Sequence, residues 1–156
     1  MAAQLAGAAL GALLLLAVWP RRHAALGTTV PSVGAVSAFA YELVLTAILM
    51  FVIMAVATDT RAVGAGAAIA IGGAVALDAL FGGPVTGASM NPARSLGPAI
   101  AAGEWDGLWV YVLAPIPGAA LGAVAYQLVR GTPPVHRSAD REEVPVDGRR
   151  ALRLPA

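Results

Sequence analysis

The amino-acid sequence predicts an all-α membrane protein, a transmembrane helix bundle of four spans and one shorter helix that enters the bilayer without crossing it. Hydrophobic residues make up 58% of the 156 residues, charged residues only 12%, and the mean hydropathy is +0.75. A water-soluble domain rarely has this composition. Two further observations support the fold class: the apolar residues form four long stretches, and an Asn-Pro pair lies between the third and the fourth.

The four apolar stretches have the length and composition of membrane spans. They cover residues 2–19, 36–57, 63–81 and 108–129. The first is not interpreted as a signal peptide, because no basic segment precedes it and no small-residue cleavage pattern follows it. Together with the short helix, the spans form a predicted transmembrane domain over residues 1–130.

The short helix is predicted to begin at Asn91. An asparagine side chain can cap free backbone N–H groups, and a proline at the first helical position, here Pro92, gives up no hydrogen bond. Glycine-rich turns are expected on both sides, with a stop near Gly103. At about 1.5 Å per residue, about a dozen residues extend only about 18 Å. The hydrocarbon core is about 30 Å thick, so this helix cannot cross it.

Beyond Arg130 the sequence becomes polar and proline-rich. Residues 131–156 cannot form a hydrophobic core, so we expect a disordered tail. Cytoplasmic loops of membrane proteins are enriched in positive side chains. The tail arginines and Arg61 fall on one side of a four-span arrangement, which predicts a cytoplasmic tail in a multi-pass protein of the cell membrane; Arg21 and Arg22 on the opposite side weaken this bias.

Two pairs of glycines four residues apart suggest close helix packing. Gly7 and Gly11 lie on the first span, and Gly118 and Gly122 on the fourth. In lipid no hydrophobic effect drives helices together, and such pairs let two backbones approach closely. We expect the first and fourth spans to cross tightly. The alternative is coincidence, because glycine and alanine are abundant in this chain.

Several function classes are excluded by composition. The chain has no cysteine, which rules out disulfide frameworks, cysteine zinc sites and thiol catalysis. His23 and His136 have no carboxylate pair, nucleophile elbow or phosphate-binding loop beside them, so no enzyme activity, metal or cofactor is expected. The tail arginines alternate with acidic residues, which argues against nucleic acid as a partner and leaves membrane lipid.

The segment around Asn91 closely resembles a signature loop of the major intrinsic proteins, the aquaporin and aquaglyceroporin family. The similarity covers residues 83–98, GPVTGASMNPARSLGP, and extends to residues 3–8, AQLAGA, which are similar to the family's third helix. Glu42 and residues 59–61 are similar to its fourth helix. The resemblance spans roughly residues 1–130 and is strongest to the nodulin-type and related bacterial branch.

This resemblance implies an incomplete six-span fold. A full family member has six spans and two half-helices in inverted repeats, whose Asn-Pro-Ala motifs meet at the centre. This sequence carries one motif and four spans, as the family's second half with one preceding helix would. We therefore expect either a fragment of a longer chain or a protein that docks with a separate N-terminal half. Family members form homotetramers, an expectation that applies here only if the chain is complete.

The resemblance further implies a passive channel for water and small neutral solutes. Asn91, with Pro92 and Ala93, would orient passing molecules, while the positive end of the half-helix repels cations and protons. Arg94 would be the arginine of the selectivity constriction, because a charge at membrane depth must face water or a partner. The structural alternative is that Arg94 ties loop carbonyls together. A nonconducting fragment remains the alternative for the whole chain.

Two alanines take further constriction positions by this resemblance, Ala88 and Ala79. Water-selective members usually carry histidine at the Ala79 position, so alanine implies a wider, less polar aperture that suits glycerol, urea or neutral metalloid hydroxides. Ser95, in contrast, departs from the aspartate that glycerol facilitators place after the arginine. The resemblance therefore leaves the preferred solute open.

Glu42 lies near the start of an apolar span, where a carboxylate is costly and needs partners. A proton relay is one interpretation. The family resemblance instead implies a scaffold, in which Glu42 accepts hydrogen bonds from the loop backbone and fixes the carbonyls of Gly87, Ala88 and Ser89. We favour the scaffold, and we group Ser95 with the same loop.

Overall fold

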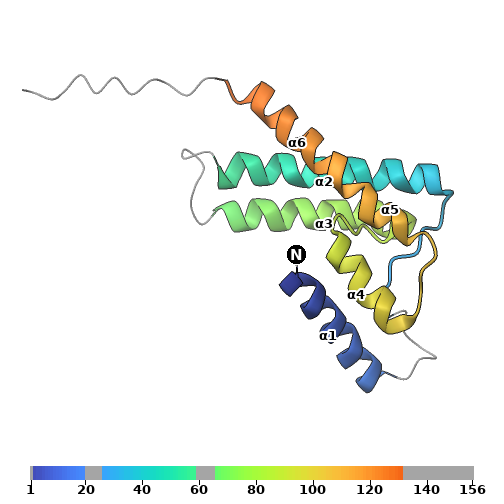
Figure 1. Ribbon diagram of the computed structural model, residues 1–156. Coiled ribbons are helices and arrows are strands. Elements are labelled where there is room, and N and C mark those ends of the chain that lie inside the picture. The colour runs from blue at the N-terminus through green and yellow to red at the C-terminus, as the bar shows by residue number, and fades with distance from the viewer. Residues whose placement is uncertain (1, 20–25, 59–65, 132–156) are drawn as a thin grey trace, which may run out of the picture.

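The computed structural model describes residues 2–19, 26–58 and 66–131, and the regular structure within these residues is entirely helical (Figure 1). The helices are α1 (Ala2–Val18), α2 (Ala35–Ala57), α3 (Gly66–Thr86), α4 (Pro92–Ala102), α5 (Leu108–Leu113) and α6 (Pro115–Val129). The predicted all-α fold class is confirmed. Arg21, Arg22, Arg61 and residues 132–156 of the predicted tail lie outside the described residues.

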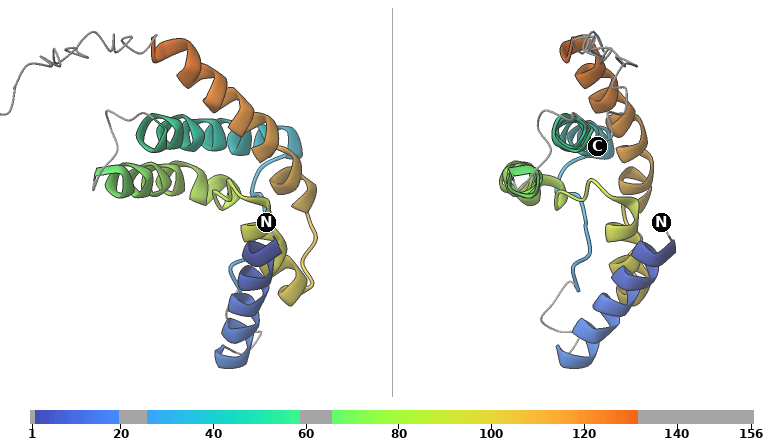
Figure 2. Two further views of the ribbon diagram at one scale, coloured as in Figure 1. Left: turned by 60° about the vertical axis from the view of Figure 1, so that its left-hand side comes forward. Right: turned by 90° about the vertical axis from the view of Figure 1, so that its left-hand side faces the viewer.

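The helices form two groups. α2 and α3 lie side by side with α6 crossing α2, while α1 packs against α4 and this pair points away from α2 and α3 (Figures 1 and 2). The short helix α4 begins just after the end of α3, where the two groups meet. This junction is the part of the fold that brings together residues from distant parts of the sequence.

Among the described residues, three helical segments are long and apolar enough to cross a membrane: Ala35–Ala57, Gly66–Thr86 and Leu108–Val129. Four spans were expected, but α1 has only 17 residues and falls below this length. Large apolar side chains are widely exposed on these helices, as on Ile69 (78%) and Leu128 (80%). Such surfaces suit contact with lipid.

The third span is longer than the sequence predicts. The predicted span ends at residue 81, before a glycine-rich turn, yet α3 continues to Thr86 and has Pro84 in its last turn. Gly82 is helical and lies against α2, where an added Cβ would collide with the Leu45 side chain. Close packing, rather than a turn, therefore explains this glycine.

The fourth span bends at a proline instead of forming one uninterrupted helix. Ala114 joins α5 to α6 with helical backbone angles, and Pro115 begins α6. Proline lacks an N–H and fixes its own φ, so it fits a first helical position better than a helix interior. The predicted bounds of this span, residues 108–129, are confirmed.

The predicted tight crossing of the first and fourth spans is wrong. α6 packs against α2, and α1 packs against α4. Gly118 and Gly122 face the α2 backbone, whereas Gly7 and Gly11 have no other group within 4 Å of an added Cβ. The spacing of the glycines was visible in the sequence, but the partner helix depends on the whole arrangement.

Candidate functional site

Asn91 caps the N-terminus of α4. Its side-chain oxygen accepts a hydrogen bond from the Ala93 N–H at 3.0 Å, and Pro92 takes the first helical position. At the other end Gly103 adopts a left-handed conformation (φ 71°), and its N–H donates to Ala99 O at 2.8 Å. The helix thus has 11 residues with the predicted start and stop. At a rise of about 1.5 Å per residue, the 11 residues of α4 are too short to cross the hydrocarbon core of a membrane.

The loop that leads from α3 to Asn91 has an unusual backbone. Gly87 (φ 85°), Ala88 (φ 44°) and Met90 (φ 53°) lie in the left-handed region. This region is readily accessible to glycine but costs other residues about 1–3 kcal/mol. Surrounding contacts must therefore hold Ala88 and Met90 in place.

Glu42 supplies these contacts from α2. It is fully buried, and its Oε2 accepts a hydrogen bond from the Met90 N–H at 2.8 Å. Its Oε1 accepts from the Ser89 N–H at 2.9 Å and from the Thr86 hydroxyl at 2.6 Å. A carboxylate with three donors is a strong acceptor for a strained backbone, because hydrogen bonds to charged groups are the stronger ones.

Two residues that were not predicted to belong to the site complete this support. The hydroxyl of Tyr111, a fully buried side chain on α5, donates to Thr86 O at 2.6 Å. Thr86 Oγ1 in turn accepts from the Ala88 N–H at 3.2 Å. Both residues are separated from Glu42 by more than 40 positions, so no local pattern could have revealed the contact.

A row of buried hydroxyl groups connects α4 to the segment before α2. Thr29 Oγ1 lies 2.6 Å from Ser95 Oγ, which lies 2.6 Å from Ser89 Oγ. Ser89 Oγ then donates to Asn91 O at 3.0 Å. Thr29 was also missed in the sequence, because a threonine in a loop carries no motif of its own.

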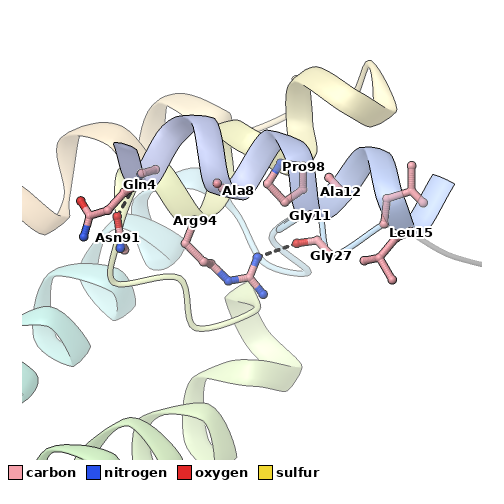
Figure 3. Close-up of a pocket in the computed structure, with 12 residues that line it drawn as sticks. Gln4, Ala8, Gly11, Ala12, Leu15, Gly27, Asn91, Arg94 and Pro98 are labelled. Carbon is pink, nitrogen blue, oxygen red and sulfur yellow. Dashed lines mark hydrogen bonds between the residues drawn. The ribbon is translucent and has the colours of Figure 1, made fainter. Parts of the chain in front are cut away.

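Arg94 extends from the first turn of α4 to the segment before α2. Its guanidinium donates a hydrogen bond to the carbonyl oxygen of Gly27 (Figure 3). The side chain remains exposed within the described residues. The Arg94 side chain therefore binds a loop carbonyl and also places a positive charge at the cavity between α1 and α4.

Two cavities meet at Asn91 and Arg94. The first has a volume of about 540 Å³ and lies between α1 and α4 (Figure 3). Its lining residues are Gln4, Gly7, Ala8, Gly11, Ala12, Leu15, Leu26, Gly27, Asn91, Ala93, Arg94 and Pro98. The second has about 640 Å³ and is lined by Gln4, Thr46, Leu49, Met50, Ile53, Val75, Ala88, Ser89, Met90, Asn91, Pro92, Arg94, Pro115, Ile116 and Ala119. Both walls are mainly apolar with a few polar side chains, as is usual for small-molecule sites.

The predicted site residues do not all gather here. Ala88 lines the second cavity together with Asn91 and Arg94. Ala79 lies exposed on α3 and lines neither of these two cavities. Gly7 and Gly11, expected to pack against another span, instead line the first cavity.

Comparison with known proteins identifies the family. A family model described as "Major intrinsic protein" matches residues 1–126. The chain belongs to the major intrinsic protein family. The resemblance found in the sequence is thereby confirmed, and with its three apolar helices of sufficient length the chain is a multi-pass membrane protein.

Its relatives include nodulin-type aquaporins from plants. Nodulin-26 of Glycine max is 52% identical over 130 residues, which cover 83% of this chain and 48% of that protein. Aquaporin NIP1-4 of Oryza sativa subsp. japonica is 50% identical with the same coverage. Aquaporin NIP6-1 of Arabidopsis thaliana is 57% identical over 104 residues, 67% of this chain and 34% of that protein. The chain thus spans about half the length, or less, of these relatives.

None of these names describes an enzyme. Within the described part of the chain, no group of three or more metal-ligating side chains occurs. The residues that line both cavities are Gln4, Asn91 and Arg94, two amides and a guanidinium, which can hydrogen-bond to a neutral molecule.

Proposed function

We propose that this chain forms the conducting half of a passive membrane channel for water and small neutral solutes. The observation that carries the proposal is the position of Asn91 and Arg94 at the N-terminus of a short helix, where both line two adjoining cavities. Membership of a family whose relatives are named aquaporins supports it. We do not expect enzyme activity.

Electrostatics favours neutral solutes at this position. The aligned peptide dipoles of α4 place about half a positive elementary charge at its N-terminus. Arg94 adds a full positive charge within the first turn. Both repel cations, while the amide of Asn91 can hydrogen-bond to an uncharged molecule.

Osmotic swelling of vesicles that contain the inserted protein tests conduction. We expect water permeability above that of empty vesicles, measured by stopped-flow light scattering. Permeability equal to that of empty vesicles, with insertion verified, would contradict conduction by this chain alone.

The second candidate is a nonconducting half that requires a separate N-terminal partner. The exposed guanidinium of Arg94 favours this alternative, because an unpaired charge is costly in lipid. Coexpression with a chain that carries a first Asn-Pro-Ala motif distinguishes the two. Swelling only in the coexpressed sample would support the partner, and a homotetramer would then be expected of the completed protein.

Two different sets of residues support a solute class and a topology for the proposed channel. Small side chains at Ala88 and, by family resemblance, Ala79 favour a wide aperture that admits glycerol, urea or neutral metalloid hydroxides. The arginines of residues 131–156 favour a cytoplasmic tail in the cell membrane.

Replacement of Arg94 by alanine should relax selectivity. Loss of one charged hydrogen bond, worth about 1.5 kcal/mol, corresponds to about tenfold, so we expect a comparable rise in the permeability ratio of larger or charged solutes to water. Arg130→Ala removes the same charge at the C-terminal end of α6 and serves as the control. An Arg94→Ala variant that does not insert would indicate a purely structural arginine.

A further inference from the structure

The segment of residues 26–32, here called the strap, lies across the base of α4. Gly27 of the strap accepts the hydrogen bond from Arg94. In addition, the Ser32 N–H donates to Val85 O at 2.9 Å, and the Ser32 hydroxyl lies 3.0 Å from the carbonyl oxygens of Pro84 and Val85. The strap therefore contacts both the end of α3 and the start of α4.

Thr29 is the buried residue at the centre of the strap. It is 5% exposed, and its hydroxyl lies 2.6 Å from that of Ser95. Its methyl group lies against Gly87, where an added Cβ would be 3.0 Å from Thr29 Cγ2. Thr29 is two positions from Gly27, and Ser95 is next to Arg94. The Thr29–Ser95 contact thus lies beside the Arg94–Gly27 hydrogen bond, in both the strap and α4.

One order of donors satisfies the whole hydroxyl row. Each hydroxyl has a single proton, and that of Ser89 is donated to Asn91 O. In this order Ser95 donates to Ser89, and Thr29, which also forms a side-chain hydrogen bond with Tyr111, donates to Ser95. Thr29 is the first donor of a directed chain that ends on the carbonyl of the α4 cap. Hydrogen bonds in such a chain strengthen one another.

We propose that Thr29 is a positioning residue for solute selectivity, which acts through Ser95 to fix Arg94 and Asn91. Without the Thr29 hydroxyl, Ser95 Oγ loses a buried hydrogen-bond partner. The strap then loses a hydrogen bond to α4 close to the Gly27 carbonyl that binds Arg94. The selectivity part of this inference rests on the proposed channel function. The positioning part concerns the local structure and can be tested without conduction.

Hydrogen exchange of the full chain in lipid nanodiscs tests the positioning part with a matched pair. Thr29→Val keeps the shape and the methyl group but removes the hydroxyl; Thr29→Ser keeps the hydroxyl. We expect amides of residues 26–32 and 87–95 to exchange about tenfold faster in Thr29→Val. Thr29→Ser and the amides of residues 38–50 should remain as in the wild type.

The double variant Thr29→Val/Ser95→Ala gives a second, independent check. Because both substitutions interrupt one chain, it should exchange no faster than Ser95→Ala alone. Equal exchange in Thr29→Val and the wild type, equally fast exchange in Thr29→Ser, or acceleration that also includes residues 38–50 would each overturn the proposal.

Vesicle permeability tests the selectivity part. Where the wild type conducts, Thr29→Val should change the glycerol-to-water permeability ratio at least about twofold at equal protein content, and Thr29→Ser should restore it. An unchanged ratio overturns the role in selectivity. A wild type that conducts nothing contradicts autonomous conduction instead, while the exchange experiment still decides whether Thr29 positions the loop.

Discussion

Glu42→Leu is expected to prevent the protein from reaching its native fold. The substitution leaves the N–H groups of Ser89 and Met90 without their acceptor, and leaves the Thr86 hydroxyl only the longer contact of 3.3 Å to Gly82 O. Each unsatisfied buried donor costs about 1–3 kcal/mol, whereas a whole domain is stable by only about 5–15 kcal/mol. Size-exclusion chromatography and thermal unfolding in detergent measure the loss.

Glu42→Gln should have an intermediate effect. The amide oxygen can still accept from Thr86 and Ser89, but the amide nitrogen would face the Met90 N–H, a donor opposite a donor. Glu104→Gln, which changes an exposed carboxylate, is the matched control. A Glu42→Gln protein with unchanged stability but without an electrogenic flux present in the wild type would instead favour the proton-relay interpretation.

Features set by local sequence were predictable. The Asn91 cap, Pro92 at the first helical position and the left-handed Gly103 determine where α4 begins and ends, and each acts within one turn. Long apolar stretches likewise located α2, α3 and the α5–α6 segment. The type and approximate position of these elements need no knowledge of the rest of the fold, whereas the end of α3 does.

Features set by contacts between distant residues were not predictable. Gly82 looks like a turn residue in the sequence but is helical and packs against the Leu45 side chain on α2. Thr29 is 66 positions from Ser95, and its hydrogen bond exists only because the strap lies across α4. The left-handed conformations of Ala88 and Met90 have no local sequence cause, since neither residue favours them.

Gly122→Leu is expected to separate α6 from α2. A Cβ at Gly122 would lie 3.0 Å from the carbonyl carbon of Ala47 and closer still to its oxygen, and 3.0 Å from Phe51 N. These are backbone atoms, so no side-chain rotation relieves the collision. Overpacking of a core typically costs about 1–3 kcal/mol, and a rigid backbone obstacle should exceed that range. For a chain of this length each kcal/mol lowers Tm by about 2–4 °C.

The same substitution on α1 provides the control. Gly11 has no other group within 4 Å of an added Cβ. Gly11→Leu removes a glycine from a helix interior, which favours the helix by about 0.5–1 kcal/mol, so its Tm should be equal to or slightly above that of the wild type. Because Gly11 lines the cavity between α1 and α4, this variant should narrow that cavity without unfolding the protein. Equal Tm values for Gly11→Leu and Gly122→Leu would contradict the role of the close α2–α6 contact in stability.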